Sequence, residues 1–101
     1  MTRRAPSTWQ RLKAGDVLVL IEKGMGLRKG ERHVVLARVR IVSVRVEALN
    51  RRNVTRAECI AEGLGHLSPA EFIEFWKRGH RHAVPATGPT YVRRIEWVYL
   101  D

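Results

Sequence analysis

The stretch from Asp16 to Glu47, DVLVLIEKGMGLRKGERHVVLARVRIVSVRVE, decides the fold. It begins with a short apolar run rich in β-branched residues and continues through a basic loop, residues 23–32, that contains three glycines. It ends in a long segment, residues 33–46, in which apolar and polar residues alternate. Alternation with a period of two over such a length indicates a half-buried antiparallel strand rather than a helix. The stretch therefore predicts a strand, a basic loop and a long strand.

The alternation changes phase once inside the long segment. Before the change, Ala37, Val39 and Ile41 form the apolar face, and Arg38 and Arg40 lie on the other face. After it, Val42, Val44 and Val46 form the apolar face, and Ser43 and Arg45 lie on the other face. A slip of one residue is typical of a β-bulge, which bends the strand that carries it. We therefore expect a small, strongly curved sheet or barrel with the basic loop at its edge.

Two short helices are predicted after the long strand. Thr55 and Glu58 have the spacing of a capping box before a helix over about 55–62, and Gly63 suits the left-handed position after its end. Ser68 and Glu71 form a second capping box before a helix over 69–78, with proline at its first position. The large apolar side chains of this second helix are expected to pack on the sheet; they are Phe72, Ile73, Phe75 and Trp76.

The two ends of the chain complete an α+β domain. Residues 91–100 alternate again and predict a C-terminal strand that closes the sheet. Residues 1–15 are expected to be irregular, with at most one helical turn near Trp9 and Leu12. A chain of 101 residues without repeats or low-complexity segments is expected to form one domain over 1–101.

The charge balance points to a polyanionic partner. The net charge is +9, and the basic residues are mostly arginine, whose planar fork suits phosphates and base edges. A GC-rich genome would produce the same preference for arginine without altering the charge. The balance predicts binding to nucleic acid first and to an anionic membrane surface second.

Several other kinds of chemistry find little support in the sequence. Cys59, His66, His80 and His82 lack the spacing of a metal site, so we expect no metal and no cofactor. The single cysteine excludes an internal disulfide and favours a reducing compartment, and Cys59 reads as a buried packing residue. No apolar run approaches the length of a membrane span, so a cytoplasmic protein that does not associate with membranes is expected.

The predicted contacts with nucleic acid come from the N-terminal segment, the glycine loop and the long strand. They are Arg3, Arg4, Lys23, Arg28, Lys29, Arg38 and Arg40. The glycines fit neither the dinucleotide-binding nor the Walker pattern, so the loop is expected to act as a flexible basic finger, or else as a plain hairpin connection. Trp9, Tyr91 and Tyr99 could each stack a base, although core packing is the commoner role of such residues.

In its order of motifs, the chain resembles the ASCH domain family of the PUA-like superfamily. The resemblance is closest to short bacteriophage and actinobacterial members, and it is carried by Lys13–Asp16, Gly24–Glu31, Ala37–Ile41, Ala61–Gly63, Leu67–Phe72 and Val92–Tyr99. It implies a curved PUA-like β-barrel, a cleft between barrel and helices, and binding of RNA or modified nucleobases. RNA is the first expectation and DNA the second.

The resemblance also implies an alternative, because some bacterial ASCH proteins are amidohydrolases that remove the acetyl group from acetylcytidine. Thr2-Arg-Arg4 resembles the end of their signature, and Glu62 lies where their glutamate falls, but the signature's lysine has no counterpart here. A carboxylate with a hydroxyl does not replace an amine, so binding is favoured over catalysis. A ribonuclease-like activity and a phage accessory protein that binds a host macromolecule are further alternatives.

Overall fold

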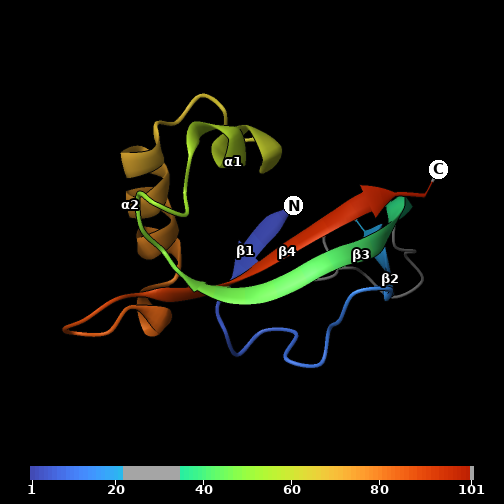
Figure 1. Ribbon diagram of the computed structural model, residues 1–101, viewed down its shortest axis with the longest axis horizontal. Helices are drawn as coiled ribbons and strands as arrows, with labels where there is room; N and C mark the ends of the chain where they lie inside the picture. Colours follow the sequence, from blue (N-terminus) through green and yellow to red (C-terminus); the bar gives the residue numbers. More distant parts are fainter. Residues whose placement is uncertain (22–34, 101) are drawn as a thin grey trace, which may run out of the picture.

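The computed structural model describes residues 1–21 and 35–100, and these build one curled antiparallel sheet with two short helices (Figure 1). The strands are β1 (Thr2–Arg4), β2 (Val17–Ile21), β3 (Val35–Ala48) and β4 (Tyr91–Tyr99). Their spatial order is β1-β4-β3-β2. The basic glycine loop, with Lys23, Arg28 and Lys29, lies outside the described residues.

The predicted bulge lies in β3 at Val42. Ile41 pairs with Trp97, and Ser43 pairs with Glu96. Between these two pairs, β3 moves on by two residues and β4 by one. Val42 is the extra residue, and its side chain is exposed. The phase slip in the sequence therefore predicted this irregularity correctly.

The bulge keeps the arginines of β3 on one face of the sheet. Arg40 lies opposite Val98 and Arg45 opposite Arg94, two β4 residues that are four positions apart and so share a face. We call this the helix-side face, because Arg94 on it contacts the helix residue Glu58. The other face is concave and carries the buried Val39, Ile41 and Ile95.

The helices are α1 (Arg56–Ala61) and α2 (Pro69–Gly79), and a short 3₁₀ turn, η1 (Arg81–Ala83), follows α2. The capping box of α2 is complete, since Ser68 and Glu71 bond to each other's backbone N–H. The predicted box of α1 is half formed: Thr55 accepts from the Glu58 N–H, but the Glu58 carboxylate is bonded to arginines. Gly63 has the expected left-handed φ of 79°.

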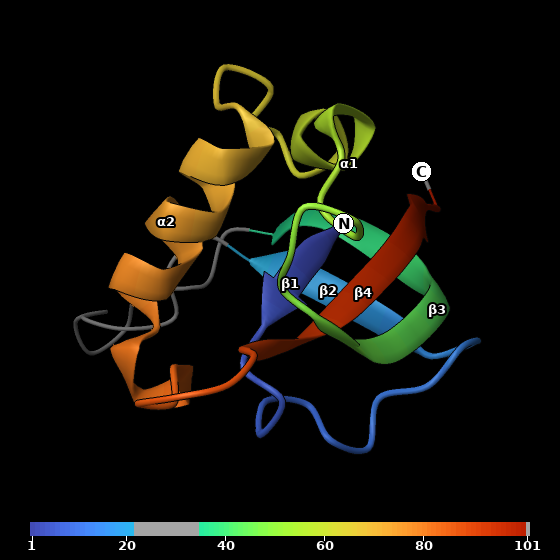
Figure 2. The ribbon, with the colours of Figure 1, turned by 60° about the vertical axis from the view of Figure 1, so that its left-hand side comes forward.

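Both helices cover one end of the helix-side face (Figures 1 and 2). Their apolar contacts with the sheet and the adjoining loops form one buried cluster of Leu49, Val54, Cys59, Phe72, Ile73, Trp76 and Val92. The expectation that Phe75 joins this core is wrong, because half of its surface is exposed. On the concave face Val42 and Val46 are likewise exposed, so the apolar face predicted after the bulge is only partly buried.

The N-terminal segment contains a strand that the sequence did not predict. Arg3 pairs with Arg94, and the three residues of β1 add an edge strand to β4. Residues 5–15 then form turns rather than the helical turn considered near Trp9, whose φ of 52° is left-handed. The coarse prediction of a curved α+β sheet with two helices is confirmed (Figure 2).

Candidate nucleic-acid interface

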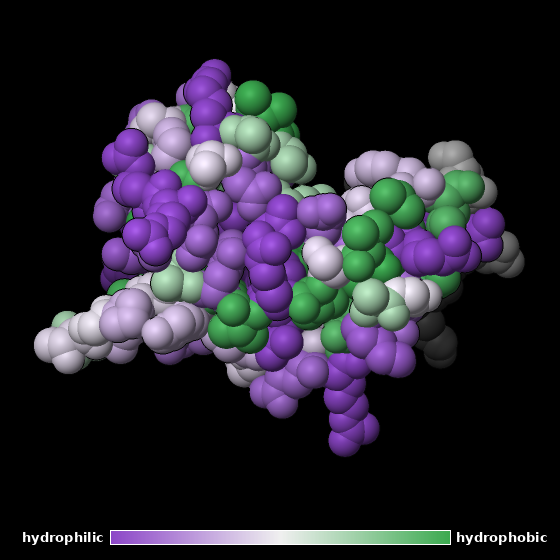
Figure 3. Space-filling model, viewed as in Figure 1, coloured by the Kyte–Doolittle hydropathy of each residue, from purple (hydrophilic) through white to green (hydrophobic). Residues whose placement is uncertain are grey.

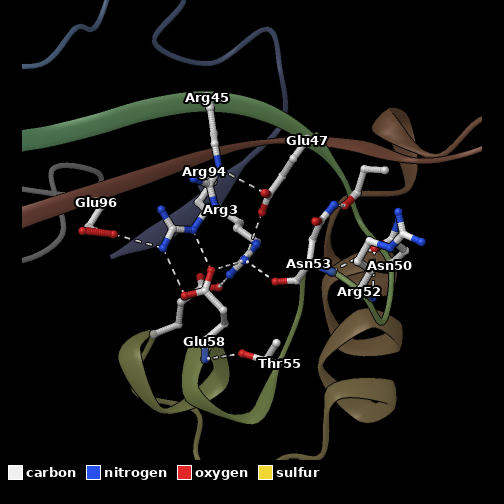
Figure 4. A network of polar contacts seen from close by, with 12 residues as sticks. Arg3, Arg45, Glu47, Asn50, Arg52, Asn53, Thr55, Glu58, Arg94 and Glu96 are labelled. Carbon is white, nitrogen blue, oxygen red and sulfur yellow. Dashed lines mark hydrogen bonds and ion pairs between the residues drawn. The ribbon is translucent and has the colours of Figure 1, made fainter.

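A buried arginine joins the N-terminal strand to the first helix (Figure 4). The Arg3 side chain is fully buried, and its guanidinium lies 3.1 Å from Glu47, 2.7 Å from Glu58 and 2.5 Å from Glu62. Burial by itself disfavours the charged form, but the hydrogen bonds to Glu62 and Glu58 outweigh it and raise the pKa of Arg3. Arg3 is therefore a structural cation inside the molecule and does not present its charge on the surface.

A second arginine completes this network. Arg94 donates two hydrogen bonds to the carboxylate of Glu58, at 2.6 and 3.0 Å, and a third to Glu96 at 3.0 Å. The bidentate contact with Arg94, together with the bond from Arg3, lowers the pKa of Glu58 to about 2. The carboxylate of Glu58 thus holds β1, β4 and α1 together as a permanent anion at neutral pH.

A cavity of about 260 Å³ lies along β1, between this strand, the end of α1 and the helix α2. Its lining is Met1, Thr2, Arg3, Arg4, Glu62, Leu64, Phe72, Phe75, Trp76 and His80. The Trp76 indole N–H donates to the Arg3 carbonyl at 3.0 Å, and the His80 ring stacks on Trp76 with centroids 4.0 Å apart. The volume is slightly below that of pockets for drug-sized ligands and suits one planar ring system.

Glu62 and Thr2, the two residues that the resemblance selects, meet in this cavity. The Glu62 side chain is only 8% exposed, so it is not the solvent-facing residue that its place at the end of a helix would suggest. Burial raises the pKa of the Glu62 carboxyl above its ordinary value, although the hydrogen bond from Arg3 acts in the opposite direction. The cavity thus combines an aromatic wall with a buried carboxyl group and a hydroxyl group.

The predicted nucleic-acid contacts fall into three groups. Arg4, Arg38 and Arg40 are exposed, and their contact with nucleic acid stays a prediction. Arg3 contradicts the prediction, because its side chain is buried and both of its terminal nitrogens bond to carboxylates inside the molecule. Lys23, Arg28 and Lys29 lie outside the described residues. Arg94 is likewise buried, with 6% of its surface exposed.

The surface carries far more exposed arginine than exposed carboxylate. In the ranges 1–20 and 37–100, the exposed acidic side chains are Glu71 and Glu74, whereas the exposed arginines are Arg4, Arg11, Arg38, Arg40, Arg45, Arg51, Arg52, Arg56, Arg78 and Arg81. The internal network explains this difference, because it withdraws three glutamates from the surface around two arginines. Hydrophilic residues accordingly cover the helical part in Figure 3, where the opposite end of the sheet shows apolar patches.

Other kinds of site were also sought. Among residues 1–21 and 35–100 there is no group of three or more histidine, cysteine or acidic residues able to hold a metal ion. No helix in these ranges is long and apolar enough to cross a membrane. Cys59 is buried as expected, and burial raises the pKa of its thiol, which disfavours the reactive thiolate.

Sequence reasoning missed Glu58 and Arg94 as parts of the site. The spacing assigns Glu58 to a capping box, and it gives Arg94 no role. The available signal was Arg94 on the same strand face as the apolar Val92 and Val98 and the acidic Glu96. A charged residue among apolar neighbours is usually buried only with a partner, and Glu96 is one partner of Arg94.

Comparison with protein-family models, with curated proteins and with solved structures found no match.

Proposed function

We propose that this protein is a nucleic-acid-binding module with RNA as its first ligand class. The excess of exposed arginine over exposed carboxylate carries the proposal. Such a surface attracts a polyanion through phosphate contacts and counterion release. The resemblance to the ASCH family of the PUA-like superfamily, whose members bind RNA or modified nucleobases, supports the same function.

In this proposal the exposed arginines outside the helices contact phosphates, and the cavity along β1 receives a base. Arg38 and Arg40 lie at the end of the helix-side face that α1 and α2 do not cover, which we call the uncovered end, in cross-strand rows with Val19 and Val17. Arg4 lines the cavity that also contains Glu62. Phosphate contacts fix the position of the strand, while the carboxyl group and the aromatic wall of the cavity discriminate between bases.

The test is a polarisation titration with a labelled single-stranded RNA at several salt concentrations. If about six arginines contact phosphates, the logarithm of the binding constant falls with the logarithm of the salt concentration with a slope of about −4 for a single strand. The double variant Arg38→Gln/Arg40→Gln is expected to make this slope less negative by about one to two. Arg78→Gln, on the outside of α2, is the matched control. Absence of binding to RNA and to DNA at low salt refutes the proposal.

A second candidate is hydrolysis of acetylated cytidine, which the meeting of Thr2 and Glu62 in one cavity favours. Glu62 would accept a proton from water, whose oxygen attacks the acetyl carbon. The C–N bond then breaks as Glu62 returns the proton to the leaving nitrogen, and cytidine and acetate are released. Incubation with acetylcytidine and chromatography of the products tests this candidate. Turnover that is lost in Glu62→Gln would establish catalysis, and absence of turnover by the unaltered protein would exclude it.

A further inference from the structure

Trp9 is an exposed tryptophan in a turn near the candidate interface. Its side chain is 41% exposed, whereas Trp76 is 4% exposed and belongs to the core beneath the helices. Core packing, the commoner role of tryptophan, therefore does not account for Trp9. A large aromatic ring that remains in solvent is a ready surface for stacking.

The backbone holds Trp9 in a conformation that tryptophan rarely adopts. Its φ is 52°, and within residues 1–21 and 35–100 it is the only residue other than glycine with a positive φ. The Thr8 N–H donates to the Ala5 carbonyl at 2.9 Å and the Leu12 N–H donates to the Trp9 carbonyl at 3.0 Å, so the turn is fixed on both sides. Strain of this kind is concentrated at functional positions, and a glycine or asparagine would relieve it.

Arg4 connects this turn to the cavity. The Cζ atom of its guanidinium lies 5.4 Å from the centroid of the Trp9 ring, in a cation–π contact. The same side chain lines the cavity that contains Thr2 and Glu62. Arg4 therefore borders both the cavity and the Trp9 ring.

We propose that Trp9 is a stacking platform for the base that neighbours the one in the cavity. In the bound state, Arg4 contacts the phosphate between the two bases and leaves one face of the indole to the neighbouring base. Bases in a duplex stack on one another, so the platform selects single-stranded nucleic acid. This inference rests on the proposed function and adds to it the class of ligand and a second subsite.

The test compares three variants in polarisation titrations with a labelled eight-nucleotide single-stranded RNA. Removal of one base–aromatic stack weakens binding by about tenfold, so this loss is expected for Trp9→Asn. Trp9→Phe keeps a ring and should remain within about threefold of the unaltered protein. Ile60→Ser, which removes an apolar side chain that is 58% exposed on α1, is the control and should change affinity by less than about twofold.

Stability provides a second readout that separates stacking from folding. Asn tolerates a left-handed φ, so Trp9→Asn is expected to melt at the same temperature as the unaltered protein or at a higher one, while its affinity falls. The unaltered protein is also titrated with acrylamide, and RNA should protect its exposed tryptophan from quenching. This measurement needs no variant and stands even if Trp9→Asn does not fold.

The results that would overturn the inference are distinguishable. If the RNA binds but Trp9→Asn binds equally well, or if bound RNA leaves acrylamide quenching unchanged, the platform is refuted and the binding function stands. If the unaltered protein binds no RNA and no DNA, the proposed function and the platform are refuted together. An equally strong loss of affinity in Trp9→Phe would show that the ring is not the essential feature.

Discussion

The two ends of the helix-side face carry the same type of residue with opposite roles. At the covered end, Arg3 and Arg94 are buried among the carboxylates of Glu47, Glu58, Glu62 and Glu96. At the uncovered end, Arg38 and Arg40 are exposed, and Arg40 lies in one cross-strand row with the exposed valines Val17 and Val98. The helix α1 makes the difference, because it supplies Glu58 above the covered end only.

The comparison shows how a very basic chain can be both stable and available to a polyanion. Burial of an arginine is costly unless carboxylates pair with it, and at the covered end three glutamates pair with the two terminal nitrogens of Arg3. These carboxylates then no longer offset the exposed arginines elsewhere. The internal network and the basic surface are consequently two results of one distribution of charge.

Deletion of Val42, which removes the bulge, should have the largest effect on stability. Without the bulge, either Arg38 and Arg40 or Arg45 and Glu47 must turn to the concave face, because a shift of one residue exchanges the faces of a strand. We expect a loss of about 4 kcal/mol or more in the free energy of unfolding, or no cooperative transition at all. Urea denaturation followed by circular dichroism measures this loss.

The control for the deletion is Val42→Thr, which keeps the length of β3 and changes a side chain that is 46% exposed. Its effect should be about 0.5 kcal/mol or less. A stable, cooperative deletion variant would show that the bulge does not fix the two faces of β3.

Arg3→Met should have the next largest effect. It leaves Glu62 buried without its cation, and loss of one member of a buried ion pair costs about 3–5 kcal/mol. The free energy of unfolding in urea is the measurement, and Arg40→Met at the uncovered end is the matched control. Destabilisation of less than about 1 kcal/mol by Arg3→Met would contradict the structural role of this arginine.

Acid should destabilise the protein at the covered end, because it protonates Glu58. The pKa of Glu58 is about 2 in the folded protein against an ordinary value of 4.5, so its contribution to stability is complete above about pH 4.5 and disappears as the pH falls toward 2. Since solvent screens part of the interaction, the contribution is about 1–2 kcal/mol.

The measurement for Glu58 is the difference in unfolding free energy between the unaltered protein and Glu58→Gln at several pH values. This difference should be constant from pH 7 to 5 and should shrink below pH 4.5. The comparison with Glu58→Gln is needed because Glu62, whose pKa is raised, responds to acid in the opposite direction. A difference that does not change between pH 5 and 3 would refute the lowered pKa.

Arg40→Met should have the smallest effect on stability and should separate stability from binding. Because Arg40 is exposed, we expect a change of about 0.5 kcal/mol or less in the free energy of unfolding. The same variant should also weaken the salt dependence of RNA binding. The change in slope should correspond to the loss of about one phosphate contact. A clear loss of stability would show that the uncovered end also serves the fold.

The sequence predicted the parts of the fold that local patterns encode. Alternation located β3 and β4, the phase slip located the bulge at Val42, and Ser68 and Glu71 located the start of α2. These patterns are local because a strand exposes alternate residues and a helix end needs a side chain to cap its free amides. The strand β1 was not predicted, since three residues are too few to show a period.

The site was predicted less completely than the fold. Thr2 and Glu62 were selected by resemblance and do meet in one cavity. Arg3 was assigned to the surface, although it is one of the most buried charged residues. Its sequence neighbour Arg4 has the same type of side chain and is exposed, so residue type alone could not separate the two.

The sequence by itself determined the alternation, the bulge, the helix caps and the net charge of +9. The tertiary structure decided which arginines became internal cations and which remained on the surface. The physical reason is that burial of an arginine depends on carboxylates from distant segments: Glu58 and Glu62 reach Arg3 only when α1 folds over β1. Local patterns report which face a residue occupies, but only the packed chain shows what covers that face.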